Sequence, residues 1–322
     1  MRIGIYGYGN VGKGVELAAT SAKDAELFGI FTRRPVETVA KTTSSKVYPA
    51  ADVMKYKDDI DVMIVCGGSA GDLVTMTPDL ARNFNVVDSF DTHAKIPEHF
   101  KTVDEAAKSG GRTALISCGW DPGLFSLARL YGDSILPSGN TYTFWGRGVS
   151  QGHSDAARRV DGVIDAREYT IPREQAVCAV RRGAAPPLTE RNMHRRECYV
   201  VAKNGADKAK IEQEIKSIPY YFDGYETTVK FITVDEMKRE HSEMPHGGFV
   251  IRNGRTGEHR HSIEYRLSLD SNPEFTGSVL VAFARAIFRM NERGQFGCKT
   301  VFDIAPADIS PLSRTEIIKK YT

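Results

Sequence analysis

The sequence predicts an α/β protein in two parts, a doubly wound parallel sheet followed by an α+β region with a largely antiparallel sheet. Three observations lead to this fold class. A glycine-rich turn of G-x-G-x-x-G spacing follows the first apolar stretch, Arg2 to Tyr6. Apolar strand-like stretches then alternate with helical ones up to about residue 120, as in sheets whose parallel strands are joined by crossover helices. After Pro137 strand-like stretches predominate, which is typical of antiparallel pairing.

The composition fits a globular protein of two domains. The chain has 322 residues, 41% of them hydrophobic, and its 43 basic and 41 acidic residues leave a net charge of +2. Such mixed charge argues against nucleic-acid or membrane-surface partners. The five cysteines show no C-x-x-C pair, so we expect reduced thiols in a cytoplasmic protein, and no bound metal. We expect no signal peptide, and the apolar stretch Val279 to Phe288 is too short to span a membrane.

The first dozen residues indicate a dinucleotide-binding site. Gly7, Gly9 and Gly12 stand between the first strand and a helix in which Val11 and Val15 recur at helical spacing. Gly7 permits the tight turn, Gly9 lets backbone approach a pyrophosphate, and Gly12 lets the helix pack closely on the strand. The helix N-terminus then faces the phosphates. A glycine-rich turn that binds nothing is the alternative.

The residues after the second strand favour NADP over NAD. That strand, Leu27 to Phe31, is followed by Thr32, Arg33 and Arg34, where an NAD site would place an acidic residue. A carboxylate would repel a 2′-phosphate, whereas a guanidinium can bind it with its planar fork. A solvated basic turn is the alternative.

Three later strands also end in small or polar residues, at the edge where ligands of open parallel sheets bind. The segments concerned are Cys66 to Ser69, Ser89 to Asp91 and Cys118 to Gly123. A plain strand-to-helix turn is the alternative for the first segment. For Asp121 the alternative is a helix cap, with Pro122 as the first helical residue.

The second half of the chain has shorter elements. We expect strands at Thr141 to Trp145, Ala166 to Ile171, Ala176 to Arg181, Glu197 to Ala202, Thr227 to Thr233, Phe249 to Arg252 and Ile263 to Leu269, with helices at Asp155 to Val160, Asp207 to Ile215 and Asp235 to His241. Asn253-Gly254 is a hairpin signal. The predicted division is 1–120, 121–274 and 275–322, the last part being a helix and tail that pack back on the first domain.

Several motifs resemble those of the meso-diaminopimelate dehydrogenase family over essentially the whole chain. They are Cys118-Gly119-Trp120-Asp121-Pro122-Gly123, Phe144-Trp145-Gly146, Ser150-Gln151-Gly152-His153-Ser154-Asp155 and Met244-Pro245-His246-Gly247-Gly248. The resemblance implies a homodimeric, NADP-dependent enzyme with a Rossmann-type first domain and a second domain for substrate binding and dimerisation. It implies oxidative deamination of the D-configured carbon of meso-2,6-diaminopimelate to L-2-amino-6-oxopimelate and ammonia, a reaction used in reverse for lysine biosynthesis.

The resemblance also implies roles for particular residues. Cofactor contacts are implied for Tyr8, Gly9, Asn10, Val11, Thr32, Arg33, Arg34, Cys66, Gly67, Gly68, Ser69, Ser89, Phe90, Asp91, Cys118, Gly119, Trp120, Asp121 and Pro122. Two of these, Asp91 and Asp121, are implied to be the catalytic carboxylates around the reacting ammonium. Substrate contacts are implied for Asp91, Asp121, Trp145, Gln151, Gly152, Thr170, Arg196, His246 and Asn272.

The residue types suit this chemistry. Asp91 and Asp121 end neighbouring predicted strands, so both could flank one ammonium and help to remove its protons. A guanidinium, a hydroxyl and an imidazole at Arg196, Thr170 and His246 suit a carboxylate. Ordinary structural roles remain as alternatives: a sheet residue for Thr170, a solvated pair with Arg195 for Arg196, and a turn residue for His246.

Two rival functions share the dinucleotide motif. One is an NADP-dependent oxidoreductase acting on a sugar or hydroxy acid, which would ordinarily need a lysine or histidine for the hydroxyl proton. The other is a catalytically silent NADP-binding sensor, which would have no use for paired carboxylates. Asp91 and Asp121 favour an amine substrate over both.

Overall fold

The computed structural model describes residues 1–69 and 71–322, and the chain forms two compact units. The first unit is Met1–Leu127 with Pro273–Thr322, and the second is Ala128–Asn272. These borders fall in α5 (Leu124–Ile135) and at the start of α11 (Asn272–Glu292), whereas the sequence patterns place them after residues 120 and 274.

The first unit is built on a seven-stranded sheet in the order β14-β6-β5-β4-β1-β2-β3, with neighbouring strands parallel. Its strands are β1 (Arg2–Tyr6), β2 (Glu26–Thr32), β3 (Val47–Pro49), β4 (Val62–Val65), β5 (Val86–Asp88), β6 (Thr113–Leu115) and β14 (Gly297–Lys299). The order reverses on either side of β1 and β4, which are neighbours. Such a switch point is where doubly wound sheets bind their ligands, outside the carboxyl ends of the strands.

Strand β4 shows why this sheet is buried on both faces. Val62 and Ile64 pack in one apolar cluster, and Met63 and Val65 pack in another. Because successive side chains of a strand point to opposite faces, the two clusters cover the two faces of the sheet. The near-continuous apolar runs of the N-terminal sequence follow from this double burial.

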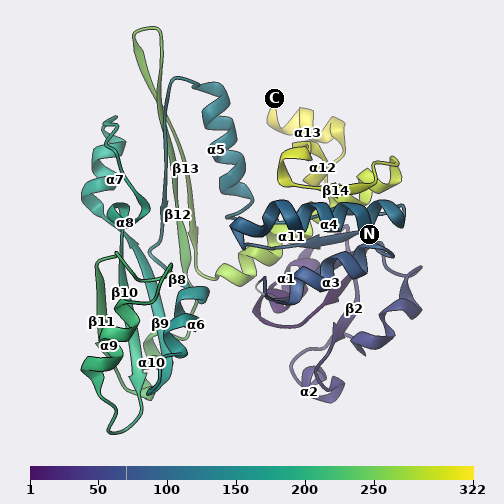
Figure 1. Ribbon diagram of the computed structural model, residues 1–322. Coiled ribbons are helices and arrows are strands. Elements are labelled where there is room, and N and C mark those ends of the chain that lie inside the picture. The colour runs from purple at the N-terminus through teal and green to yellow at the C-terminus, as the bar shows by residue number, and fades with distance from the viewer. Residues whose placement is uncertain (70) are drawn as a thin grey trace. The chain divides into compact units, whose positions relative to one another are not determined.

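Helices contribute further side chains to both clusters, and Figure 1 shows these helices beside the sheet. The helical segments of the first unit are α1 (Asn10–Ser21), α2 (Val36–Ala40), η1 (Ala50–Tyr56), α3 (Asp72–Ala81), η2 (His93–Lys95), α4 (Ile96–Ser109), η3 (Val301–Asp303), α12 (Pro306–Ile309) and α13 (Arg314–Tyr321). Helix α11 packs in the cluster of Val62, with its Leu280 and Ile287 fully buried. It crosses α1 closely, because a Cβ on Gly14 or Gly277 would overlap backbone atoms of the other helix.

The second unit contains two sheets. One has the order β11-β10-β9-β8 and the other β13-β12-β7. The strands are β7 (Gly139–Trp145), β8 (Gly148–Ser150), β9 (Val163–Pro172), β10 (His194–Ala202), β11 (Thr227–Phe231), β12 (His246–Thr256) and β13 (His259–Leu269). Only β10 and β11 pair in parallel among the described strands of this unit. The predicted fold class is confirmed: a parallel doubly wound sheet precedes an α+β region with largely antiparallel sheets.

Short helices cover one face of the first of these sheets. The helices of this unit are α6 (Gln151–Arg158), α7 (Glu174–Arg181), α8 (Glu190–Met193), α9 (Lys208–Lys216) and α10 (Val234–Glu240). An apolar cluster joins Ala157 of α6 and Ile215 of α9 to Ala166 of β9 and Cys198 of β10. Side chains of β9 and β10 on this face are therefore shielded from water.

Two local predictions are wrong. The stretch Ala176 to Arg181 is helix α7 and not a strand, because Val177 and Val180 bury one helical face. The strands β12 and β13 do form the predicted hairpin, which Figure 1 shows as a long twisted ribbon. Its turn follows Thr256, however, and Asn253 and Gly254 are paired within the ladder.

Two classes of feature are not found in the described part of the chain. None of its helices combines the length and the apolar composition that a bilayer crossing requires. Within residues 1–69 and 71–322, no group of three or more histidine, cysteine or acidic side chains is arranged to hold a metal ion.

Candidate active site

The glycine-rich turn joins β1 to α1 as its spacing predicts. Gly7 has φ +96°, and a Cβ there would overlap the Cys66 carbonyl oxygen, so the turn requires glycine. A Cβ on Gly12 would overlap the Gly7 carbonyl oxygen. Gly9 differs, because a Cβ there would meet no atom of the described residues within 4 Å. The backbone at Gly9 thus borders open space at the start of α1.

The start of α1 is suited to an anion. Gly9 is its N-cap and offers no side-chain cap, and the first turn has no acidic residue. The positive end of the helix dipole is therefore not neutralised by the helix's own sequence. Asn10 and Val11 are the first helical residues, beside the open space at Gly9.

Tyr8 and Arg34 connect the glycine turn to the end of β2. The Tyr8 ring is buried, its hydroxyl donates to Glu16, and burial raises the pKa of this phenol to about 12. The Arg34 guanidinium donates to the Tyr8 backbone carbonyl, and its N–H donates to Thr32 Oγ1 at 3.0 Å. The Tyr8 ring therefore points into the protein, and its backbone carbonyl helps to fix the Arg34 side chain.

Arg33 connects β2 to the loop after β4. Its Nη2 donates to Asp72 Oδ1 at 2.7 Å, and the Gly68 N–H donates to the other oxygen of this carboxylate at 3.2 Å. The hydrogen bond from Arg33 holds the pKa of Asp72 below its usual range. The Arg33 side chain is 62% exposed, so its guanidinium can still reach a dissolved anion.

The two cysteines among the predicted cofactor contacts, Cys66 and Cys118, are not reactive thiols. Burial raises the pKa of the Cys66 thiol to about 12 and that of Cys118 well above its ordinary value. Because the thiolate is the reactive form, both side chains are inert near neutral pH. Gly67 lies against Asp72, since a Cβ on Gly67 would meet the Asp72 Cβ at 2.7 Å.

Asp88 holds together the loops that carry Asp91 and Asp121, and the sequence patterns missed it. It ends β5, is 0% exposed, and its Oδ1 accepts the backbone N–H groups of Phe90 and Ser117, each at 3.0 Å. Asp91, three residues after Asp88, is exposed, and its backbone N–H donates to Ser69 Oγ at 3.1 Å. Strands β5 and β6 are neighbours in the sheet, as predicted.

Two side chains complete the bonding of this carboxylate. Thr77 Oγ1 donates to Asp88 Oδ2 at 2.7 Å, and His99 Nε2 lies 2.9 Å from the same oxygen. The His99 ring stacks on Phe90 with centroids 4.2 Å apart. The sequence does offer one sign of this role, because Asp88 directly follows two valines of a buried strand. Burial of a carboxylate costs free energy unless the group is fully hydrogen-bonded.

The loop after β6 bears on the alternative that Asp121 caps a helix whose first residue is Pro122. The Gly119 N–H donates to the Pro122 carbonyl at 2.9 Å, and α5 begins only at Leu124. Gly123 therefore stands between Pro122 and the helix, so Pro122 is not the first helical residue and Asp121 is not directly before the helix. Trp120 is 7% exposed.

In the second unit Arg196 and Thr170 lie opposite each other on β10 and β9. The guanidinium donates to the Thr170 hydroxyl, and its CZ atom stands 4.2 Å from the centroid of the Tyr225 ring. Arg196 and Thr170 are each 6% exposed, so the alternative of a solvated arginine pair is wrong. Arg195 points to the other face of the sheet, where it donates to Glu197 at 2.6 Å.

His246 lies beside this pair. The segment around it is held to β8, because the Val149 N–H donates to the Pro245 carbonyl at 2.9 Å. A Cβ on Gly148 would overlap the His246 imidazole, and Gly148 is the β-ladder partner of Thr170. The structure therefore brings His246, Thr170 and Arg196 together from three strands.

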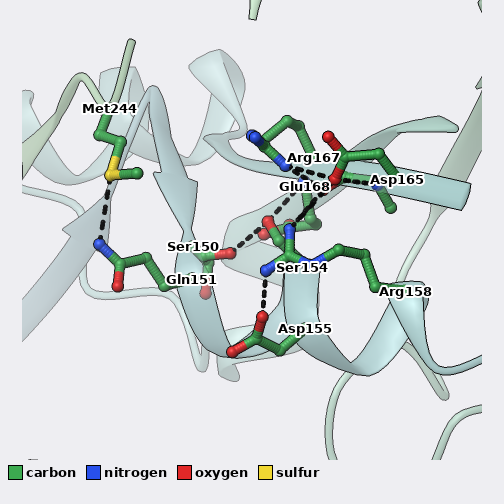
Figure 2. Close-up of polar contacts among 10 residues, drawn as sticks. Ser150, Gln151, Ser154, Asp155, Arg158, Asp165, Arg167, Glu168 and Met244 are labelled. Atoms are coloured by element: carbon green, nitrogen blue, oxygen red, sulfur yellow. Dashed lines mark hydrogen bonds and ion pairs between the residues drawn. The ribbon is translucent and has the colours of Figure 1, made fainter. Parts of the chain in front are cut away.

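Met244 brings Gln151 and Asn272 together. Gln151 Nε2 lies 3.3 Å from Met244 Sδ, a contact that Figure 2 shows at the start of α6. The Asn272 N–H donates to the Met244 carbonyl at 2.9 Å. Gln151 and the adjacent Gly152 are exposed.

Trp145 is positioned by a histidine that the sequence patterns missed. The Trp145 N–H donates to His194 Nε2 at 2.8 Å, and the two rings stack at 5.3 Å. His194 Nδ1 lies 3.0 Å from the Glu190 carbonyl, and burial lowers the pKa of this imidazole to about 4. The neutral ring thus accepts with Nε2 and donates with Nδ1.

The chain is also similar to known proteins in sequence and in structure. Residues 119–271 match the family model described as the diaminopimelic acid dehydrogenase C-terminal domain. The meso-diaminopimelate D-dehydrogenase of Acetivibrio thermocellus is 56% identical over 98% of this chain and 96% of its own. The C. glutamicum enzyme in complex with DAP has a TM-score of 0.95 at 45% identity, covering 100% of this chain and 99% of the other.

A further solved structure concerns the cofactor. An engineered D-amino acid dehydrogenase bound to NADP+ has a TM-score of 0.90 at 43% identity, covering 100% of this chain and 99% of the other. The resemblance found in the sequence motifs is confirmed over the full length. The chain belongs to the meso-diaminopimelate D-dehydrogenase family.

Proposed function

We propose that this protein catalyses the NADP-dependent oxidative deamination of the D-configured carbon of meso-2,6-diaminopimelate, giving L-2-amino-6-oxopimelate and ammonia, and that it runs the reverse reaction for lysine biosynthesis. The observation that carries the proposal is a buried N–H of Arg196 that has no acceptor in the described part of the chain. Its Nε is buried and has no acceptor among the described residues, beside a hydroxyl and an imidazole. A buried guanidinium N–H without an acceptor leaves a donor for a ligand, and a carboxylate fits a guanidinium.

The residues of the first unit fit NADP. The open space at Gly9 admits a pyrophosphate against backbone, and the α1 N-terminus favours its charge. Arg33 and Arg34 at the end of β2 are proposed to hold the 2′-phosphate, and the phosphate would then share Arg33 with Asp72. The chemistry that NADP supplies when bound is acceptance of the hydride from the D-configured carbon.

The remaining proposed cofactor contacts are backbone and loop residues at the carboxyl ends of five strands. They are Tyr8, Asn10 and Val11 after β1, Thr32 at the end of β2, Cys66 to Ser69 after β4, Ser89 to Asp91 after β5, and Cys118 to Pro122 after β6.

Asp91 and Asp121 are proposed to act on the reacting end. Each carboxylate can accept a hydrogen bond from the ammonium at the D-configured carbon, and one of them takes the proton that must leave as the carbon–nitrogen double bond forms. The network around Asp88 fixes the Asp91 loop and the Ser117 backbone before the Asp121 loop.

The second unit is proposed to read the distal, L-configured end. Arg196, Thr170 and His246 bind its carboxylate, and Gln151 and Asn272 supply amide groups for its remaining polar atoms. Trp145 and Gly152 would line the chain of the substrate. Because the two ends of meso-diaminopimelate carry the same groups in opposite configuration, binding of the far end decides which carbon reacts.

The proposed assembly is a homodimer in the cytoplasm. Strand β13 is the edge of its sheet and most of its residues are exposed, as expected for a surface that pairs with a second copy. All five cysteines are unpaired, which suits a reducing compartment. Sedimentation equilibrium across a concentration series tests the dimer, and a monomer at every concentration would contradict it.

The function is tested by supplying NADP with the meso, LL and DD isomers of diaminopimelate and following NADPH and ammonia together. We expect equal release of both products with the meso isomer, none with the LL isomer, and slow turnover with the DD isomer. NADPH formation from sugars or hydroxy acids without ammonia would favour another oxidoreductase. Tight NADP binding without turnover of any diamino acid would favour a sensor.

A further inference from the structure

Glu168 is a buried carboxylate in direct contact with the proposed distal site. It lies on β9 two residues before Thr170, so both side chains point to the same face of the sheet. Its side chain is 0% exposed. Arg196 Nη1 donates to Glu168 Oε1 at 3.2 Å, and Thr170 Oγ1 lies 3.3 and 3.4 Å from the two carboxylate oxygens. None of the roles proposed above uses this residue.

The backbone of Glu168 is fixed as well. Its N–H donates to Ser154 Oγ at 2.9 Å, and this hydroxyl donates to the Ser150 carbonyl at 2.6 Å, a chain of contacts that Figure 2 shows between β9, α6 and β8. The carboxylate is therefore held in place, and it holds one nitrogen of Arg196. The Arg196 Nε remains without an acceptor among the described residues.

We infer that Glu168 is the positioning residue of the distal site: it orients Arg196 and Thr170, and it takes up one proton from solvent when the distal carboxylate of the substrate binds Arg196. The inference rests on the proposed function, since it needs a substrate with a distal carboxylate. No bond other than that to the proton forms or breaks. The proton returns to solvent when the product leaves.

Without this protonation, the Glu168 carboxylate and the distal carboxylate of the substrate would share the one buried guanidinium of Arg196. Like charges at close range in a site that excludes water cannot both stay ionised at modest cost, and protonation of one relieves the repulsion. Burial already raises the pKa of Glu168 to about 7, even though Arg196 opposes this shift. A second carboxylate raises it further. The protonated side chain can still accept from Arg196 through its carbonyl oxygen.

Two neighbouring titratable groups, Cys198 and His153, do not take up this proton in place of Glu168. Cys198 stands opposite Glu168 on β10, and burial raises the pKa of its thiol, so it stays neutral. His153 on α6 is also neutral, because burial lowers the pKa of its imidazole to about 3. Arg158 on α6 donates to the Asp155 carboxylate. Tyr225 under the guanidinium and His246 beside Thr170 complete the surroundings.

Proton uptake by Glu168 should make the affinity for meso-diaminopimelate depend on pH. At a pH well below 7 Glu168 is already protonated in the free enzyme, and binding takes up no proton. Above that value the free enzyme must first gain one, so the affinity for meso-diaminopimelate falls as the pH rises, by at most about tenfold per pH unit. A simple D-amino acid has no distal carboxylate, and its binding should not show this dependence.

The test is isothermal titration of the enzyme saturated with NADPH, using meso-diaminopimelate at about pH 8 in phosphate and in Tris. These buffers differ in ionisation enthalpy, so the difference in heat counts the protons taken up. We expect close to one proton in the parent and none in Glu168→Gln, whose neutral side chain mimics the protonated form. The KM for meso-diaminopimelate should rise above about pH 7 in the parent and stay flat in the variant.

Glu197→Gln is the matched control. Glu197 is the neighbouring glutamate on the other face of β10, where it is bound by Arg195, and its variant should keep the proton uptake. Equal uptake in the parent and Glu168→Gln would overturn the inference. Should that variant fail to fold, absence of proton uptake by the parent would overturn it equally. A parent that does not turn over meso-diaminopimelate at all contradicts the proposed function, whereas turnover without proton uptake contradicts only the role of Glu168.

Discussion

Arg196 and Thr170 face each other across the antiparallel ladder of β10 and β9, and the guanidinium donates to the hydroxyl. Their side chains lie on the face that α6 and α9 cover, and Arg195 lies on the opposite face. A shift of the ladder by one residue would exchange these two arginines, because side chains alternate between the faces of a strand. The register of this strand pair therefore decides which arginine is available to a ligand.

The glycine turn offers a prediction that separates folding from binding. Gly9→Ala should leave the thermal midpoint of the free protein nearly unchanged, since the added methyl meets no atom of the described residues within 4 Å. It should weaken NADP binding by at least about tenfold, because the methyl occupies the space proposed for the pyrophosphate. Thermal unfolding with and without NADP measures both effects.

Gly7→Ala is the companion variant. Its methyl would overlap the Cys66 carbonyl oxygen at a φ of +96°, so the free protein itself should be destabilised. If Gly9→Ala binds NADP as well as the parent does, the proposed position of the pyrophosphate is wrong.

The arginines after β2 should determine the choice of cofactor. Loss of a charge-assisted contact to a phosphate costs about 1.5–3 kcal/mol, so Arg33→Ala combined with Arg34→Ala should raise the KM for NADP by at least about tenfold. The KM for NAD should change little. Steady-state kinetics with each cofactor give the comparison, and equal losses for both would show that this pair does not bind the 2′-phosphate.

The carboxylates of Asp91 and Asp121, in the loops after β5 and β6, should be required for turnover. Asp91→Asn or Asp121→Asn should each lower kcat by about 10²-fold or more, as expected when a group that takes a proton is replaced by one that cannot. Because asparagine caps helices about as well as aspartate does, the thermal midpoint of Asp121→Asn should match that of the parent. Full activity in either variant would remove that carboxylate from the mechanism.

Asp88 should matter for stability. Asp88→Ala leaves two buried backbone N–H groups without their acceptor and breaks the contact with His99, and should lower the free energy of unfolding by at least about 3 kcal/mol. Thr77→Val removes one hydroxyl donor only and should cost about 1 kcal/mol. Urea unfolding measures both in a Trp145→Phe background, where the remaining tryptophan, Trp120, reports on the first unit. Equal stability of the parent and Asp88→Ala would contradict this role.

The sequence predicted those features that follow from local patterns. The glycine turn and the positions of β1 and β2 depend on spacing and strand period alone. The expectation that Asp91 and Asp121 end strands is wrong, because β5 ends at Asp88 and β6 at Leu115 and both carboxylates lie in the loops that follow. The stretch Ala176 to Arg181 was misassigned because Val177, Cys178 and Val180 have strand propensity, which the burial of one helical face overrides.

The buried polar partners could not be predicted in the same way. Glu168 is indistinguishable in sequence from an exposed strand residue until β10 places Arg196 beside it. His194 and Asp88 likewise acquire their roles through partners 28 or more residues away, such as Ser117 for Asp88 and Trp145 for His194. Interactions at such separations depend on the tertiary fold, which local patterns do not encode.

The central claim is that the far end of the substrate selects the reacting carbon through Arg196. The most direct test is the ratio of kcat/KM for meso-diaminopimelate to kcat/KM for D-leucine, measured in the parent and in Arg196→Met. Methionine removes the charged partner of the distal carboxylate, a loss of about 1.5–3 kcal/mol with meso-diaminopimelate, whereas D-leucine has no such group to lose. The account predicts that the ratio falls by at least about tenfold in the variant, and an unchanged ratio would contradict it.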